Sequence, residues 1–285
     1  MKPLQDIRVL TGALNLPGPV ACARLFQMGA TITKVEPPQG DPLEQGKLKW
    51  YRELHRGVEI IRLNLKDPQD RSRLDPLLEK TDLLVTATRP AALARLGLSW
   101  AELHARFPHL GQVAIVGYPP PSNELPGHDL SYQARVGLVT PPHLPRTVLA
   151  DLAGAQEVVS MALGLILARE RGLGCHYLQV SLAEAACRFS EPLRYGLTAP
   201  GGLLGGGFPG YNLYRCRDGW IALAALEPHF WLKLAKEFCL QSPTQEQLEL
   251  IFQTQTAQEW ETWGVYHDLP IVAVRDAPPN EENRG

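Results

Sequence analysis

The sequence predicts an α/β protein built on a parallel β-sheet. The leading observation is the order of segments at the amino terminus, where an apolar run at 7–11, a helix-type run at 20–28 and a β-branched run at 31–35 follow one another. Parallel strands need a crossover connection, so this order indicates a strand–helix–strand unit. The same alternation repeats as far as residue 195. With 285 residues, 45% of them hydrophobic, the chain is long enough for one large or two moderate domains with a sizeable core.

Each later segment fits this alternation. Pro19 stands near the first turn of the first helix, where its fixed φ is tolerated. Ser99 and Glu102 form a capping-box pattern, which predicts a helix reaching Arg106. Arg89, followed by proline, is expected to start a short turn that extends to 95–97. Further strands are expected at 59–65, 83–87, 110–117 and 177–181, and further helices at 66–79, 151–171 and 183–195.

A change of composition at 200–210 predicts a division into two domains. This glycine-rich segment is typical of a flexible linker, and it would separate a large domain at 1–199 from a small α+β domain at 211–275. A disordered tail is expected at 276–285. In the small domain we expect a hairpin of strands 211–216 and 220–226 around Arg217-Asp-Gly. Three helices should follow: the first at 228–239, the second capped by Ser242 with Pro243 at its first position, and the third opened by the capping box of Thr256 and Glu259. A last strand is expected at 271–274.

Charge and cysteine usage exclude several classes of function. The formal net charge is −2 at pH 7, which argues against nucleic acid or an anionic membrane as a partner. Five scattered cysteines without a Cys-x-x-Cys spacing argue against a disulfide framework and a zinc site. No Gly-x-Gly-x-x-Gly follows the first strand, so no nicotinamide or flavin cofactor is expected, and no metal. Without an amino-terminal apolar run before a cleavage site, or an apolar span of roughly 20 residues, we expect a soluble cytoplasmic protein.

The segment 126–154 is the candidate functional site. It holds four groups that can move or hold protons, His128, Asp129, Tyr132 and Asp151, near glycines that let a backbone approach a ligand. Prolines at 141–145 exclude regular helix, so an irregular loop joins the two halves of the segment. A structural interpretation stays open for each group, because a loop histidine often only packs and an aspartate before an apolar helix is often only an N-cap.

Motifs along nearly the whole chain resemble those of the family III CoA-transferases, and within them the α-methylacyl-CoA racemase branch. They occur in the order and spacing of that family. The matching stretches are Leu-Pro-Gly-Pro-Val-Ala-Cys-Ala-Arg-Leu (16–25), Gly-Ala-Thr-Ile-Thr-Lys-Val-Glu-Pro-Pro (29–38), Leu-Asn-Leu-Lys (63–66), Gly-His-Asp-Leu-Ser-Tyr (127–132), Ala-Asp-Leu-Ala-Gly (150–154), Arg-Gly-Leu-Gly-Cys-His-Tyr-Leu-Gln-Val-Ser-Leu (171–182) and Leu-Glu-Pro-His-Phe (226–230).

The resemblance implies a Rossmann-like large domain, a smaller domain, and a homodimer of two chains interlocked as rings. It implies acyl-CoA substrates, with coenzyme A as part of the substrate rather than a separate cofactor. The catalytic groups implied are His128 and Asp151, with Glu227 in support and Tyr132 beside the thioester. The resemblance also implies contacts with coenzyme A from the side chains of Lys34 and Arg95, from the segment of Leu63, Asn64, Leu65 and Lys66, and from the backbone of Gly127 through Asp129 to Tyr132. Arg89, at the end of a predicted strand, is a further cation expected near the phosphates.

Two bases suit inversion of a carbon next to a thioester carbonyl, because one proton leaves one face and another arrives at the opposite face. An imidazole such as that of His128 can work in either direction at neutral pH. Asp151 needs a raised pKa to act as an acid. Burial would raise it and the adjacent helix start would lower it, and the sequence leaves the balance open.

Two other readings remain open. In the transferase branch of the family the aspartate is a nucleophile that carries acyl intermediates, which here would be Asp151. The third reading is a non-catalytic acyl-CoA binder, suggested by a loop between His128 and Asp151 that is shorter than in typical racemases and by an early carboxyl end.

Overall fold

The computed structural model describes residues 1–276 and divides the chain into two compact units, Met1–Ser190 and a second beginning at Glu191. The division therefore falls ahead of the expected boundary at 199/200. Nearly all of the tail expected at 276–285 lies outside the described residues.

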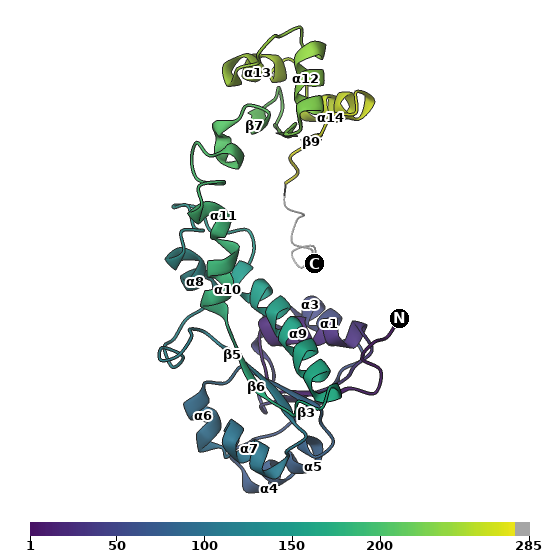
Figure 1. Ribbon diagram of the computed structural model, residues 1–285, viewed down its shortest axis with the longest axis vertical. Helices are drawn as coiled ribbons and strands as arrows, with labels where there is room; N and C mark the ends of the chain where they lie inside the picture. Colours follow the sequence, from purple (N-terminus) through teal and green to yellow (C-terminus); the bar gives the residue numbers. More distant parts are fainter. Residues whose placement is uncertain (277–285) are drawn as a thin grey trace. The chain divides into compact units, whose positions relative to one another are not determined.

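The first unit is built on a six-stranded sheet in which every pair of neighbours is parallel, as the strand–helix–strand pattern predicts (Figure 1). Its order is β3-β2-β1-β4-β5-β6, the order of a Rossmann-like sheet. The chain winds outward from β1 in both directions, so the carboxyl ends of β1 and β4 form a switch point where ligands bind in such sheets. The strands are β1 Arg8–Thr11, β2 Thr31–Glu36, β3 Glu59–Arg62, β4 Leu83–Thr86, β5 Gly111–Val116 and β6 Tyr177–Ser181.

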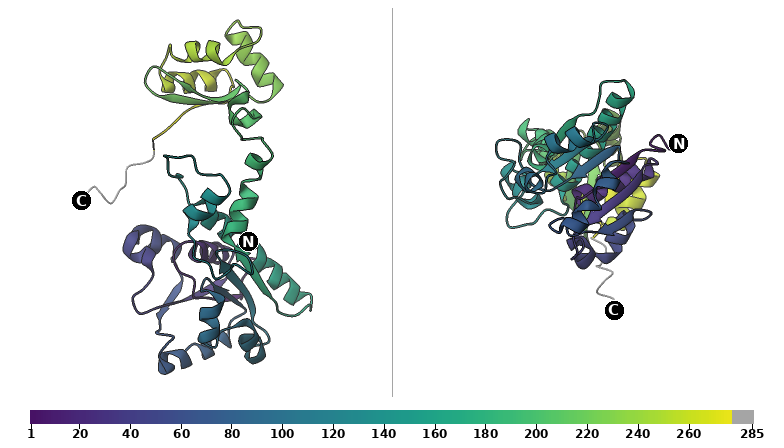
Figure 2. Two further views of the ribbon diagram at one scale, coloured as in Figure 1. Left: turned by 90° about the vertical axis from the view of Figure 1, so that its left-hand side faces the viewer. Right: turned by 90° about the horizontal axis from the view of Figure 1, so that it is seen from below.

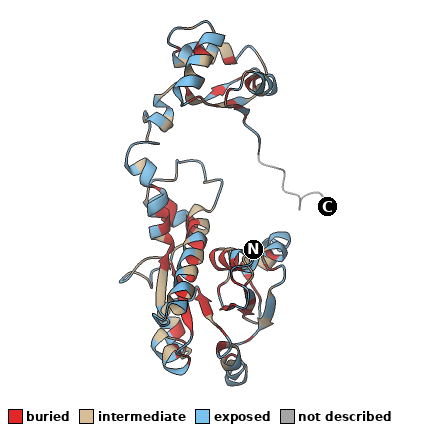
Figure 3. Ribbon diagram, turned by 45° about the vertical axis from the view of Figure 1, so that its right-hand side comes forward, coloured by how far each residue is buried: buried red, intermediate tan, exposed pale blue. Residues whose placement is uncertain are grey.

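Helices cover both faces of this sheet and give it two cores. One core joins the sheet to α1 and α9 through side chains such as Leu25 and Val158. The other joins it to α5, α6 and α7 through Leu78, Leu93 and Leu103. Figure 3 shows buried residues concentrated on the strands and on the sides of the helices that face them. The helices are α1 Pro17–Gln27, α2 Pro42–Gly46, α3 Leu48–Leu54, α4 Pro68–Ser72, α5 Asp75–Leu78, α6 Pro90–Arg95, α7 Trp100–Arg106, α8 Asp129–Arg135, α9 Leu149–Glu170 and α10 Leu182–Phe189.

Several short helices differ from the sequence-based expectation. The turn expected from Arg89 is α6, which begins with Pro90 at its first position. The helix expected at 66–79 is two helices, α4 and α5, each with a proline near its start. Helices α2, α3 and α8 were not predicted, because segments of five to seven residues are too short to show an apolar period.

Helix α9 is the one helix of the described chain that is long and apolar enough, by length and composition, to cross a membrane. Its 22 residues include five that belong to the first core, among them Ala155 and Ala162. Packing against the sheet accounts for part of its apolar character, while Met161 and Leu167 of the same helix are exposed.

The second unit is a three-stranded antiparallel sheet with helices on one face, seen on the left of Figure 2. Its core includes Tyr214, Phe252 and Trp260. The hairpin around Arg217-Asp-Gly is confirmed, and so is the capping box of Thr256 and Glu259. The elements are α11 Glu191–Arg194, the π-type turn η1 Leu203–Gly207, β7 Tyr211–Arg215, β8 Trp220–Ala224, α12 Pro228–Glu237, α13 Gln245–Phe252, α14 Ala257–Tyr266 and β9 Ile271–Ala273.

Two details of this unit differ from expectation. The N-cap of α13 is Thr244 rather than Ser242, because the Thr244 hydroxyl accepts a hydrogen bond from the backbone N–H of Gln247. The glycine-rich segment is a closed turn in which Gly202 and Gly205 bond to nearby carbonyls. A Cβ at either glycine would collide with a backbone oxygen, so glycine is needed there for close packing.

Candidate active site

Two adjoining cavities lie at the carboxyl ends of the parallel strands. The larger, about 350 Å³, is lined by segments that follow β1, β2, β3 and β4. The smaller, about 190 Å³, is lined by segments after β1, β4 and β5 and by the starts of α8 and α9. Leu14 lines both, so the two cavities are neighbours. This is the sheet edge at which a Rossmann-like fold binds ligands.

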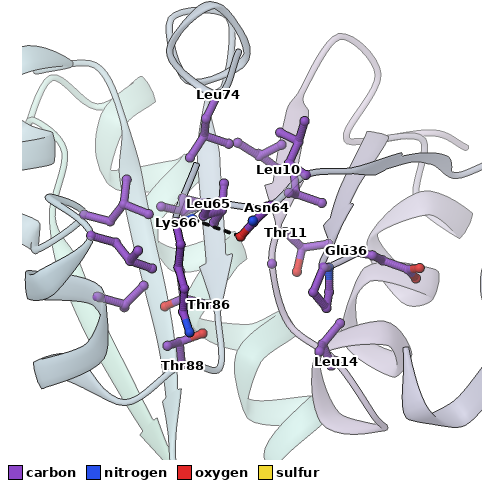
Figure 4. A pocket seen from close by; sticks show the side chains of 18 of the residues that line it. Leu10, Thr11, Leu14, Glu36, Asn64, Leu65, Lys66, Leu74, Thr86 and Thr88 are labelled. Atoms are coloured by element: carbon purple, nitrogen blue, oxygen red, sulfur yellow. Dashed lines mark hydrogen bonds between the residues drawn. The ribbon is translucent and has the colours of Figure 1, made fainter. Parts of the chain in front are cut away.

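The larger cavity is mostly apolar and contains one of the expected coenzyme A segments (Figure 4). Leu63, Asn64, Leu65 and Lys66 all line it. The backbone N–H of Lys66 donates to Oδ1 of Asn64 at 3.2 Å, which holds the turn after β3. The Lys66 side chain extends toward Thr86 and Thr88 in Figure 4, so an exposed cation stands at the border of an apolar space.

The smaller cavity brings together most of the expected catalytic residues. His128, Tyr132 and Asp151 all line it, together with Gly127 and Arg89. His128 is exposed, Tyr132 is buried and Asp151 is half-buried. The irregular segment between α8 and α9 therefore folds back so that the starts of both helices border one cavity.

Asp151 is the third residue of α9 rather than its N-cap, which is Val148. Burial, and next the nearby Asp129 carboxylate, raise the pKa of its carboxyl to about 6, and His128 opposes the shift. The net shift is upward, in the direction that burial favours. At neutral pH most of the Asp151 carboxyl is ionised and more basic than an exposed aspartate.

Asp129, one of the four groups expected to move or hold protons, makes side-chain hydrogen bonds that the sequence did not predict. Its backbone was assigned to coenzyme A, but its buried carboxylate accepts hydrogen bonds from the backbone N–H of Asp151 at 3.1 Å and from Nε2 of Gln133 at 2.6 Å. Gln133 was missed by the sequence analysis. The signal that could have found it is its position four residues after Asp129, which places both side chains on one face of a helix.

Tyr132 packs closely between two glycines. A Cβ at Gly127 would lie 2.6 Å from its ring, and one at Gly117 would lie 2.5 Å from its hydroxyl. Its ring meets that of Tyr118 edge-on, with centroids 5.2 Å apart. Burial raises the pKa of the Tyr132 hydroxyl to about 12, so at neutral pH this group is a hydrogen-bond donor and not a base.

Lys34 lies in a different environment from the one its expected contact with coenzyme A requires. Its ammonium is buried, 2.5 Å from Asp41 Oδ2 and 3.0 Å from Glu36 Oε1. Nε2 of His55 is 2.8 Å away, and since Nδ1 of His55 faces the carbonyl of Tyr51, Nε2 accepts from the ammonium. Burial, and next the charge of Lys34, lower the pKa of His55, which keeps it neutral. The charge of Lys34 is thus neutralised inside the fold and does not face either cavity.

The same cluster is the one group of three potential metal ligands among residues 1–276: Glu36, Asp41 and His55. The Lys34 ammonium contacts all three, so the cation of this cluster is the protein's own side chain.

Arg95 and Glu227 are the two remaining expected site residues. Arg95 is exposed at the end of α6 and lines neither cavity. Glu227 belongs to the second unit, where it is the N-cap of α12. Its supporting role stays a prediction.

The chain is similar in sequence and fold to known proteins. The family described as CoA-transferase family III matches residues 4–278. A probable fatty acyl-CoA transferase of Mycobacterium tuberculosis is 26% identical over 96% of this chain and 86% of its own length. The succinyl-CoA–D-citramalate CoA-transferase of Chloroflexus aurantiacus is 27% identical over 82% of this chain and 64% of its own length. A crystal structure of the mycobacterial protein superposes with a TM-score of 0.85 at 25% identity, covering 96% of this chain and 86% of that one.

The chain thus spans most of one relative and under two thirds of the other. The expectations of a homodimer, a cytoplasmic location and no separate cofactor stay predictions.

Proposed function

The chain belongs to CoA-transferase family III, and on that premise we propose that it transfers coenzyme A between carboxylic acids through covalent intermediates on Asp151. One observation carries the proposal. The half-buried Asp151 carboxyl lines a small cavity that opens beside a larger apolar one, so a long ligand held in the larger cavity can present its reactive end to Asp151.

The shapes and charges of the cavities suit an acyl-CoA. The apolar lining of the larger cavity fits an adenine ring and a pantetheine chain, and Lys66 offers a positive charge to the phosphates. The smaller cavity, with Asp151 and Tyr132, receives the thioester. Both named relatives are called transferases, and the Chloroflexus name pairs a CoA thioester with a carboxylic acid.

The reaction needs no oxidant and no net proton. A carboxylate oxygen of Asp151 attacks the thioester carbonyl carbon, the C–S bond breaks, and an anhydride and the coenzyme A thiolate result. The thiolate then attacks the Asp151 carbonyl carbon, which releases the first carboxylate and leaves an aspartyl thioester. The incoming carboxylate reverses both steps and departs as the new thioester.

Neighbouring groups suit these steps. The protonated Tyr132 hydroxyl and the backbone N–H groups in the first turn of α9 are donors for the oxyanion that forms when Asp151 attacks. The raised pKa of Asp151 makes its carboxylate a stronger nucleophile while leaving most of it ionised at neutral pH.

Acyl-CoA racemisation is the second candidate, favoured by the presence of His128 and Asp151 in one cavity. In that reaction one group removes the α-proton and the other returns a proton to the opposite face. The expected contribution of Glu227 belongs to this candidate.

Trapping separates the candidates. The protein is incubated with succinyl-CoA or a fatty acyl-CoA and a carboxylate acceptor, then treated with hydroxylamine or borohydride and mapped by mass spectrometry. We expect modification of Asp151 that depends on the thioester, none in Asp151→Asn, and normal modification in Glu79→Gln, an exposed carboxylate that lines neither cavity.

Parallel incubation in D₂O tests the second candidate. Deuterium at the α-carbon with no trapped Asp151, lost in both His128→Ala and Asp151→Ala, would establish racemisation instead. Binding of coenzyme A with neither outcome would identify a non-catalytic binder.

A further inference from the structure

We propose that the buried Asp129–Gln133 pair of α8 is the positioning device for Asp151, acting on its backbone and on the charge beside its side chain. The inference rests on the proposed function, in which Asp151 is the reacting group. It assigns to Asp129 a role distinct from the backbone contact with coenzyme A that its motif implies.

The first part of the device is a set of hydrogen bonds between two helices. Oδ1 of Asp129 accepts from the backbone N–H of Asp151 at 3.1 Å. Nε2 of Gln133 donates to Oδ2 of Asp129 at 2.6 Å and to the carbonyl of Thr147 at 3.1 Å. Asp129 is 8% exposed and Gln133 2%, so these bonds form away from water, where losing a partner is costly.

Helix α9 depends on these bonds at its start. Its N-cap is Val148, which has no side-chain acceptor for the free N–H groups of the first turn. Asp129 supplies that acceptor from another helix, and Gln133 holds the residue just before the N-cap. Residues 136–148, all within the described chain, contain no helix or strand, so α8 rather than the connecting segment sets where α9 begins.

The second part is electrostatic. Both oxygens of Asp129 accept N–H bonds, an arrangement suited to a carboxylate, and its charge raises the pKa of Asp151 beyond the effect of burial. The other charged or titratable groups that border Asp151 are His128 and Tyr132 on α8 and Arg89 after β4. Of these, His128 lowers the pKa of Asp151, so Asp129 is the neighbour that keeps the reacting carboxylate basic.

The test uses two variants with different expected signatures. Asp129→Asn keeps the Oδ1 acceptor and removes the charge, so the midpoint of the rising limb of kcat/KM against pH should move to lower pH. Gln133→Met keeps the volume and removes the bonds to Asp129 and Thr147, so kcat should fall about tenfold, since small misplacements of a reacting group are costly. The midpoint should move little in this variant. Glu79→Gln, which removes a charge outside both cavities, should match the wild type.

Selective ¹³C labelling of aspartate carboxyls measures the titration of Asp151 directly, with the Asp151→Asn spectrum identifying its signal. We expect a lower midpoint in Asp129→Asn than in the wild type. An unchanged midpoint in a folded Asp129→Asn protein, or losses of melting temperature without any change in kcat in Gln133→Met, would overturn the proposal.

This measurement also separates the two proposals. If no thioester reacts with the wild type, the proposed function fails, while the carboxyl titration of Asp151 still decides whether Asp129 controls its charge. If Asp129→Asn does not fold, the kcat and titration of Gln133→Met remain as the test of positioning.

Discussion

The backbone N–H of Asp151 donates a 3.1 Å hydrogen bond to Oδ1 of Asp129, a residue 22 positions earlier in the chain. This bond joins the starts of α9 and α8 at the wall of the smaller cavity. It also brings a second carboxylate beside the one that we propose reacts.

Asp151→Asn should stabilise the protein in a pH-dependent way. The pKa of the folded carboxyl is about 6 against an ordinary 3.8, so ionisation disfavours the folded state. The stability that the wild type gains from burying a neutral Asp151 carboxyl is therefore fully present below pH 3.8 and is lost as the pH rises through about 6. At about 1.4 kcal/mol per pKa unit, the variant should gain at most about 3 kcal/mol at pH 8 and nothing at pH 3.5. Urea unfolding across this range measures it, and a gain that does not vary with pH would contradict the assignment.

Gly127→Ala should displace Tyr132. The new Cβ would lie 2.6 Å from the ring, so the ring or the backbone must move, at a cost of about 1–3 kcal/mol. The proposed transfer activity should fall with stability, because Tyr132 lines the cavity in which we place the thioester. Gly164→Ala on α9 is the matched control. Nothing lies within 4 Å of its Cβ position, and a helical alanine should stabilise by about 0.5–1 kcal/mol. Equal effects of the two substitutions on activity would contradict the packing argument.

Lys34→Met should destabilise the first unit by about 3–5 kcal/mol, because Glu36 and Asp41 would be left buried without their cation. Chemical denaturation measures the loss, with the exposed Lys80→Met as a control expected to change stability little. A stable Lys34→Met protein that binds coenzyme A poorly would instead support direct contact between Lys34 and the ligand.

Lys66→Ala should weaken binding of coenzyme A about tenfold at low salt, since it removes the cation at the border of the larger cavity. Pantetheine, which lacks the phosphates, should bind the variant and the wild type equally. Calorimetric titration distinguishes the ligands, and Lys80→Ala should leave both affinities unchanged. A uniform loss of affinity for both ligands would mean that Lys66 holds the cavity's shape and does not bind phosphate.

The sequence by itself determined the features that depend on neighbours along the chain. Apolar and β-branched runs separated by helices predicted the parallel sheet, and capping boxes at Ser99 and Thr256 marked two helix starts. The family motifs placed His128, Tyr132 and Asp151 together, and all three line one cavity. Such signals can be read locally because propensity, capping and periodicity act over one or two turns.

The tertiary structure alone decided which side chains meet across the fold. Lys34 was expected to contact a ligand. Successive side chains of β2 lie on opposite faces of the sheet, and Lys34 lies on the face where Tyr51, His55 and two carboxylates surround it. Gln133 reaches the carbonyl of Thr147 only because α9 begins beside α8 in the folded chain. A side chain's burial, its partners and its pKa depend on groups far away in sequence, and no local pattern encodes those distances. The sequence therefore singled out Asp151 as a candidate, while the folded chain decided what surrounds its carboxyl and how basic it is.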